Sequence, residues 1–122
     1  MNKLIKSVVA LFAALGIMMG VTACAPAEPV DMTNITAVID VRTPAEYAEG
    51  HLEGALLMDV QGTDFANKVA TLDPAGNYVV YCRSGNRSAA AIDQMKSLGF
   101  TNLTDGGAVA TAASLTGLPV VQ

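Results

Sequence analysis

A cysteine between a strand-like run and a polar loop is the feature of this sequence best suited to chemistry. Cys82 follows the apolar run 78–81 and precedes the short glycine-containing loop 83–87, after which a helix is predicted to start at Ser88. A loop that curls before a helix turns backbone N–H groups inward and, with the helix N-terminus, forms a site for negative charge. Such surroundings lower a thiol pKa from about 8.5 to roughly 3.5–7.5. The pattern therefore predicts that Cys82 is a thiolate nucleophile.

Two arginines beside this cysteine strengthen the interpretation. Arg83 and Arg87 lie within five residues of Cys82, and a nearby guanidinium group favours the charged form of a thiol. The alternative is a buried structural cysteine followed by an arginine-containing turn, since a lone cysteine in a strand is usually a core residue. Cys82 ends its strand and is followed by polar residues, which favours the reactive interpretation.

The first residues are typical of a secretory leader. Lys3 and Lys6 precede a nearly unbroken apolar run at 8–21, which is short for a membrane-spanning helix because such helices need about 20 residues. The segment 21–24, valine-threonine-alanine-cysteine, resembles the lipobox of bacterial lipoproteins. This resemblance implies cleavage before Cys24 and lipidation of its sulfur. An ordinary signal peptide with an incidental cysteine, or an uncleaved anchor, is the alternative.

These features predict three parts: a lipoprotein signal peptide at 1–23, the lipidated Cys24 with a flexible proline-containing tether at 24–34, and one domain at 35–122. The expected location is the bacterial cell envelope, with the lipid in a membrane and the domain facing the periplasm or the cell exterior. Residues 24–122 carry five basic and eleven acidic side chains, a net charge of −6. An acidic domain without a basic face argues against nucleic acid as a partner, so membrane contact is expected through the lipid alone.

The cysteine and histidine content narrows the chemistry further. With Cys24 lipidated, Cys82 is the only free thiol, and no structural disulfide is expected. One histidine, His51, and one thiol cannot supply the three or four ligands of a zinc site, so we predict no metal. We also predict no cofactor.

Strand-like and helix-like segments alternate along the chain, which predicts an α/β fold with a small parallel sheet of about four to five strands and helices on both faces. The predicted strands lie at 37–39, 55–58, 78–81 and 102–104. The predicted helices lie at 44–49, 64–72, 88–98 and 108–115.

Several segments together resemble the rhodanese family. Loop 82–87 matches the family's pattern of cysteine, four residues and arginine. Segments 39–47 and 50–55 resemble its second motif, and 98–100 and 106–107 resemble its closing segments. Related phosphatases place five residues between cysteine and arginine, so the four residues here disfavour phosphatase or arsenate chemistry.

The resemblance implies a thiosulfate sulfurtransferase. Cys82 would take sulfane sulfur from thiosulfate, a persulfide or a polysulfide, and pass it to cyanide or an external thiol. Arg87 would be the second catalytic residue, and the substrate would be bound by Arg83, Ser84, Gly85, Asn86 and Ser88. Asp40 and Arg42 would brace the loops, and His51 would be a hydrogen-bonded structural residue rather than a base.

Two departures from the family bear on the substrate. Few residues precede Ala37, so the customary first strand and helix are shortened or absent, and small residues at 108–113 replace the large aromatic residues that usually wall the pocket. We therefore expect a shallow or open pocket, accessible to a protein or polysulfide partner. Two other functions stay open: a persulfide carrier in an envelope sulfur relay, and a non-catalytic binding module. The intact Cys82 and Arg87 argue against the second.

Overall fold

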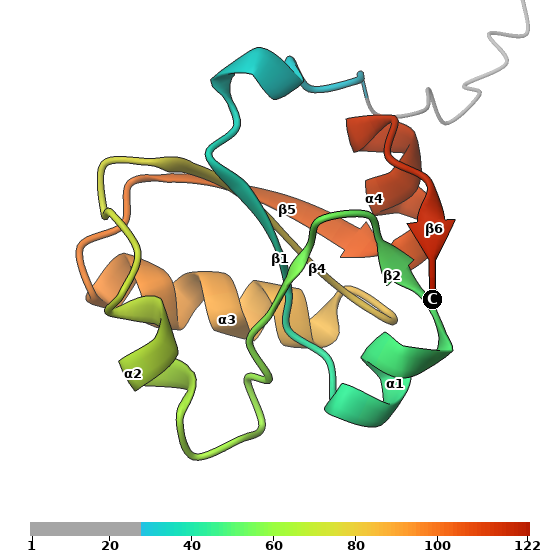
Figure 1. Cartoon of the computed structure of the whole chain (residues 1–122). Helices are drawn as coiled ribbons and strands as arrows, with labels where there is room; N and C mark the ends of the chain where they lie inside the picture. The colour runs from blue at the N-terminus through green and yellow to red at the C-terminus, as the bar shows by residue number, and fades with distance from the viewer. Residues whose placement is uncertain (1–27) are drawn as a thin grey trace, which may run out of the picture.

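Four short segments pair in parallel and form the central sheet of the domain. The computed structural model describes residues 28–122, in which the strands follow the order β3-β1-β4-β5 (Figure 1). Their bounds are Ala37–Asp40 for β1, Leu56–Leu57 for β3, Asn77–Cys82 for β4 and Asn102–Ala108 for β5. All three pairings are parallel, which confirms the predicted fold class.

The register of β1 and β4 brings the carboxyl ends of these two strands side by side. Asp40 pairs with Tyr81, and Cys82 follows directly at the end of β4. The pairing of β4 with β5 shifts between Val80 and Tyr81, so that Val80 pairs with Asp105 but Tyr81 pairs with Gly107. This irregularity bends the end of β5 beside Cys82, because a bulge re-aims the strand that contains it.

Helices cover both faces of the sheet, as predicted. On one face, α2 (Phe65–Val69) and α3 (Asn86–Ser97) pack against the side of β4 that carries Tyr78, Val80 and Cys82. On the other face, α4 (Val109–Thr116) packs against Val79 and Tyr81, and α1 (Pro44–Glu49) lies on the same side. Figure 1 shows α2 and α3 together on one side of the sheet and α4 on the other.

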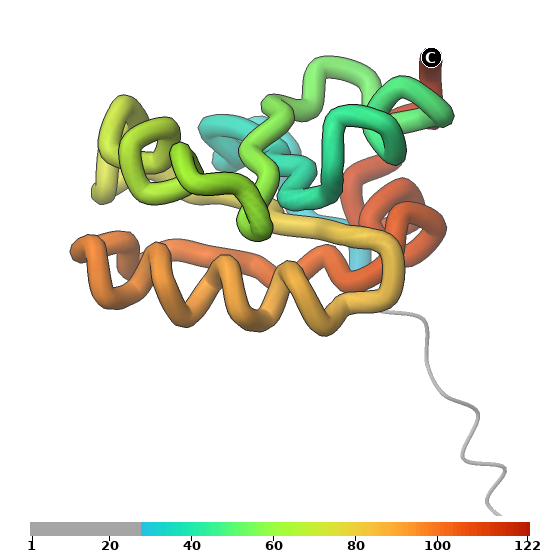
Figure 2. The backbone as a smooth tube through the Cα atoms, turned by 90° about the horizontal axis from the view of Figure 1, so that it is seen from below, coloured from blue at the N-terminus to red at the C-terminus, as the bar shows by residue number. Residues whose placement is uncertain are grey.

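A second, two-stranded sheet was not expected from the sequence. β2 (His51–Leu52) pairs antiparallel with β6 (Val120–Val121), and the tube in Figure 2 shows the C-terminus returning to this green segment. Two-residue strands have no periodicity to detect, and this pairing joins segments about seventy positions apart in the sequence.

The segment before β1 lies against the domain. A 3₁₀ turn at Met32–Asn34 is capped by Asp31, whose Oδ1 accepts from the Thr33 N–H at 3.0 Å, and the Val30 N–H donates to the Leu115 carbonyl at 2.8 Å. Thus Val30, which the sequence predicted as part of the tether, is hydrogen-bonded to α4. The predicted leader at 1–23 and the lipidated Cys24 lie outside the described residues. Within 28–122, none of the helices is long and apolar enough to cross a membrane.

Candidate functional site

Cys82 lies where β4 ends, at the carboxyl edge of the sheet. The residue is 0% exposed and belongs to the hydrophobic core on the α3 side of the sheet. The backbone N–H of Gly85 donates a hydrogen bond to Cys82 Sγ over 2.9 Å. The sulfur is therefore buried, but the loop that follows it turns an N–H group toward it, as the sequence predicted.

The pKa of Cys82 reflects a balance between burial and these donors. Burial raises the pKa of the thiol, because a thiolate loses hydration in the core. Hydrogen bonds from the backbone N–H and hydroxyl of Ser88, and from the backbone N–H groups of Gly85 and Ser84, lower it by more. The net pKa is below its ordinary value, so the site stabilises negative charge on the sulfur.

Gly85 makes this loop geometry possible. Its φ of +94° lies in the left-handed region, which side chains other than glycine rarely adopt. A Cβ at this position would lie 3.7 Å from the Cα of Gly107, so loop and β5 approach closely here. The kinked backbone turns the Gly85 N–H to the sulfur and starts α3 at the next residue, Asn86, two positions before the predicted start.

The other predicted loop residues differ in their exposure to solvent. Arg83, Ser84 and Asn86 are exposed, whereas Arg87 is half-buried and Ser88 fully buried. The structure does not show the pocket over the sulfur as open, because Cys82 has no exposed surface. Small residues after Gly107 therefore do not by themselves uncover the nucleophile.

Arg87 forms a two-point ion pair with Glu46 of α1. Its two terminal nitrogens donate to the two carboxylate oxygens at 2.7 and 2.9 Å, and both side chains are about one-fifth exposed. The hydrogen bond to Arg87 lowers the pKa of Glu46 to about 2. Arg87 also lies close enough to Cys82 for their charges to interact. The ion pair thus ties the start of α3 to α1.

Ser88 contacts β5 as well as the loop. Its Oγ lies 2.9 Å from the Gly85 carbonyl oxygen and 2.7 Å from Asp105 Oδ1. The Gly107 N–H donates to the same Asp105 oxygen at 2.9 Å. The sequence predicted Ser88 as part of the loop, and the structure adds Asp105 as its partner.

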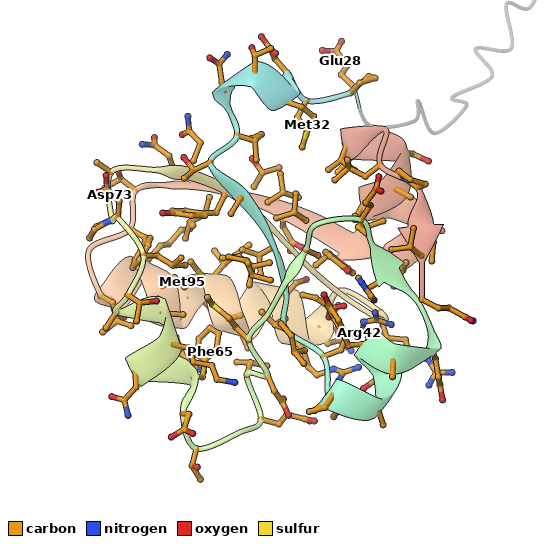
Figure 3. The ribbon with its side chains drawn as sticks, in the orientation of Figure 1. Glu28, Met32, Arg42, Phe65, Asp73 and Met95 are labelled. Atoms are coloured by element: carbon orange, nitrogen blue, oxygen red, sulfur yellow. The ribbon has the colours of Figure 1, made fainter. Side chains whose placement is uncertain are left out.

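Asp40 and Arg42 form a buried pair at the end of β1 (Figure 3, where Arg42 is labelled). Arg42 donates from Nε and one terminal nitrogen to the Asp40 carboxylate, with a shortest distance of 2.7 Å, and the same terminal nitrogen donates to the Gly50 carbonyl. Tyr81, next to Cys82, donates its hydroxyl to Asp40 at 2.9 Å and accepts from the Leu52 N–H at 3.0 Å. This network ties β1, β4 and β2 together.

His51 takes no part in this network and contacts Tyr47 instead. Its ring stacks on Tyr47 at a centroid distance of 3.6 Å, and Nδ1 lies 2.8 Å from the Tyr47 carbonyl oxygen. These contacts hold the α1–β2 turn. Within residues 28–122, no three His, Cys, Asp or Glu side chains come together as metal ligands.

Three residues of the site were not predicted from the sequence as functional: Glu46, Tyr81 and Asp105. A local signal existed for Glu46, since Thr43 and Glu46 have the spacing of a helix capping box, and the Thr43 hydroxyl does accept from the Glu46 N–H at 3.3 Å. Its contact with Arg87, 41 positions away, carries no such signal.

Comparison with known proteins gives a consistent result. The sequence profile of the rhodanese-like domain matches residues 27–113. A probable adenylyltransferase/sulfurtransferase, MoeZ of Mycobacterium tuberculosis, is 36% identical over 81 residues, which cover 65% of this chain and 21% of the relative. The thiosulfate sulfurtransferase PspE of Escherichia coli is 31% identical over 71 residues, covering 57% of this chain and 66% of that protein. The chain thus spans less than two thirds of either relative.

The fold agrees as well. A solved structure described as rhodanese with anions from E. coli superimposes with a TM-score of 0.59 at 26% sequence identity, over 70% of this chain and 96% of that one.

Proposed function

The chain belongs to the rhodanese-like domain family, and on this premise we propose that it is a sulfurtransferase in which Cys82 carries sulfane sulfur as a persulfide. The observation that carries the proposal is the hydrogen bond of 2.9 Å from the Gly85 N–H to Cys82 Sγ. It places a donor where negative charge resides in the resting thiolate. Relatives of similar sequence are named sulfurtransferases.

The reaction proposed for thiosulfate has two displacements. The Cys82 thiolate attacks the outer sulfur of thiosulfate, an S–S bond forms, and the donor's S–S bond breaks with its electron pair leaving on sulfite. Cyanide or a thiolate then attacks the terminal sulfur of the Cys82 persulfide, and thiocyanate or a new persulfide departs. The Cys82 thiolate is regenerated, so neither an added oxidant nor a reductant is required.

The loop residues have distinct roles in this proposal. The backbone N–H groups of Ser84, Gly85 and Ser88, which already lower the pKa of Cys82, stabilise the charge on the sulfur. Arg87 attracts the anionic donor, and Arg83, exposed on the same loop, adds to this attraction. Because Cys82 is buried, entry of the donor requires the loop 83–87 to shift.

A carrier in a protein sulfur relay is the second candidate. One observation favours it: Arg87 is already paired with Glu46, which weakens its attraction for a dianion.

A donor comparison tests the proposal. The purified chain is supplied with cyanide and either thiosulfate or a protein persulfide, and thiocyanate is measured. We expect thiocyanate with thiosulfate as the donor. Because cyanide also takes sulfur directly from a protein persulfide, thiocyanate is counted only above the amount formed with a Cys82→Ser chain. An excess with the protein persulfide alone would support the relay carrier, and no excess with either donor would contradict sulfur transfer.

We further propose that Cys24 anchors the protein to a bacterial envelope membrane. The leader and the lipobox-like segment 21–24 support this. Cys24→Ala is expected to abolish incorporation of labelled lipid and to release the protein from the membrane fraction, because the thioether forms on the cysteine sulfur. Membrane retention equal to that of the unchanged chain would contradict the anchor.

A further inference from the structure

The ion pair of Arg87 and Glu46 lies at the edge of the sheet where β4 ends. α1 begins shortly after β1, and α3 begins shortly after β4, and these two strands are neighbours with Asp40 opposite Tyr81. α1 and α3 pack on opposite faces of the sheet, so a contact between their first turns passes the edge at which β4 ends in Cys82 (Figure 1). Ligands of open α/β sheets bind at this edge.

Glu46 engages both terminal nitrogens of Arg87. The two N–H groups donate to separate carboxylate oxygens at 2.7 and 2.9 Å, which is the two-point geometry that a guanidinium forms with a carboxylate or another oxyanion. An anionic sulfur donor would use the same two nitrogens. While Glu46 holds them, they are not free for the donor, and the charges of the pair cancel.

Glu46 is itself held in place by its own helix. It lies in the first turn of α1, and the hydroxyl of Thr43 donates to Glu46 Oε1 at 3.2 Å. Arg87 lowers the pKa of Glu46 to about 2, so the carboxylate keeps its charge. The loop therefore carries a built-in anion on the arginine that would otherwise receive one from solution.

Arg83 is the other cation of the loop. It is exposed and forms no ion pair with any residue of 28–122. Water and salt screen an exposed charge, so Arg83 attracts a small anion only weakly. The site thus offers a dianion much less attraction than its two arginines suggest.

We propose that Glu46 is a specificity-determining residue that, by engaging Arg87, turns the site away from dianionic sulfur donors and toward donors of lower charge, such as a persulfide monoanion. This inference deepens the proposed function and rests on it, since it concerns which donor loads Cys82. Coulombic attraction is proportional to the charge of the ligand. Neutralising Arg87 therefore weakens the binding of thiosulfate, a dianion, more than that of a monoanion.

A matched pair of donors tests the inference. Methanethiosulfonate has the reacting sulfur of thiosulfate but a methyl group in place of one charged oxygen, so it is a monoanion. The Cys82 thiolate takes its outer sulfur, and the S–S bond of the donor breaks with its electron pair leaving on methanesulfinate. Transfer to cyanide is measured with both donors in the full chain carrying Cys24→Ser, above the amount formed when Cys82→Ser is also present.

Glu46→Gln is the test variant, because it removes the charge and keeps an oxygen for the Thr43 hydroxyl. We expect kcat/KM to rise about tenfold for thiosulfate and about threefold for methanethiosulfonate, since the effect on the logarithm scales with donor charge. The gain should lie in KM rather than in kcat, because the freed guanidinium binds the donor. Should Glu46→Gln not fold, Glu46→Ala is compared in the same way with the same expectation.

Two controls separate the release of Arg87 from a simple loss of negative charge. Glu49, on the same helix, is exposed and forms no ion pair with the residues of 28–122, and Glu49→Gln is expected to change either kcat/KM less than about twofold. In an Arg87→Gln background, Glu46→Gln is expected to change the ratio of the two kcat/KM values less than about 1.5-fold.

Alkylation of Cys82 gives a second readout that needs no sulfur transfer. Iodoacetate and iodoacetamide differ by one negative charge, and the ratio of their rates cancels changes in loop opening and in the thiolate population. We expect Glu46→Gln to raise the ratio of the iodoacetate rate to the iodoacetamide rate about threefold, but less than about 1.5-fold when Arg87→Gln is also present.

Sulfur transfer with either ratio unchanged in Glu46→Gln would overturn the inference alone. Ratios that change equally with and without Arg87→Gln would do so too, because the charge of Glu46 would then act directly on the donor. An alkylation ratio that rises through Arg87 in a chain that transfers no sulfur from either donor would overturn the proposed function alone. A chain whose Cys82 reacts with none of these four reagents would contradict both.

Discussion

Replacing Cys82 with serine is expected to lower sulfur transfer by roughly a thousandfold or more, because the serine hydroxyl is a far weaker nucleophile and forms no persulfide. Serine keeps an acceptor for the Gly85 N–H that now donates to Sγ. The fold should therefore persist, at a cost of about 1 kcal/mol for the change in the core. Thiocyanate formation and urea unfolding measured on the same sample separate the two effects.

The matched control is Cys24→Ser, the same substitution at the other cysteine of the chain. It should retain full transfer, since Cys24 has no part in the proposed chemistry. Undiminished activity in Cys82→Ser, or loss of activity in Cys24→Ser, would contradict the assignment of the nucleophile.

The second large effect is expected on stability. Arg42→Ala should lower the free energy of unfolding by about 3–5 kcal/mol, because it leaves the Asp40 carboxylate charged, buried and without its cation. Asp40 is 0% exposed, and the hydrogen bond to it raises the pKa of Arg42, as expected of a close ion pair. The change also removes the donor to the Gly50 carbonyl. Urea unfolding monitored by circular dichroism measures the loss.

A double variant is the control for this prediction. Asp40→Asn with Arg42→Met removes both charges and keeps similar volumes, so it is expected to cost much less than Arg42→Ala alone. A double variant as unstable as the single one would show that packing at Arg42, rather than the stranded charge of Asp40, dominates.

The sequence predicted the fold well because each central element has a strong local pattern. The strand at 78–81 is apolar throughout, and it is buried on both faces in the structure. The helix at 44–49 has a threonine cap and a proline at its first position, and it has the predicted bounds. Elements without such a pattern, namely β2, β6 and the turn at 32–34, were not predicted.

The sequence predicted only those parts of the candidate site that are neighbours along the chain. The positions of Cys82 and Gly85 in one loop follow from adjacent residues, and so does the N–H group that faces the sulfur. The partners of that loop do not, because Glu46 and Asp105 meet Arg87 and Ser88 only once the strand order and the irregular β4–β5 register are set. Tyr81 was identified as a strand residue, but its hydroxyl bond to Asp40 depends on the pairing of β1 with β4.

Mass spectrometry of the intact protein after incubation with thiosulfate tests the central claim most directly. The full chain with Cys24→Ser, in which Cys82 is the only cysteine, should gain the mass of one sulfur atom. The gain should map to the peptide containing Cys82 and disappear on addition of cyanide. A chain that never acquires this sulfur, from thiosulfate or from a protein persulfide, would contradict the account.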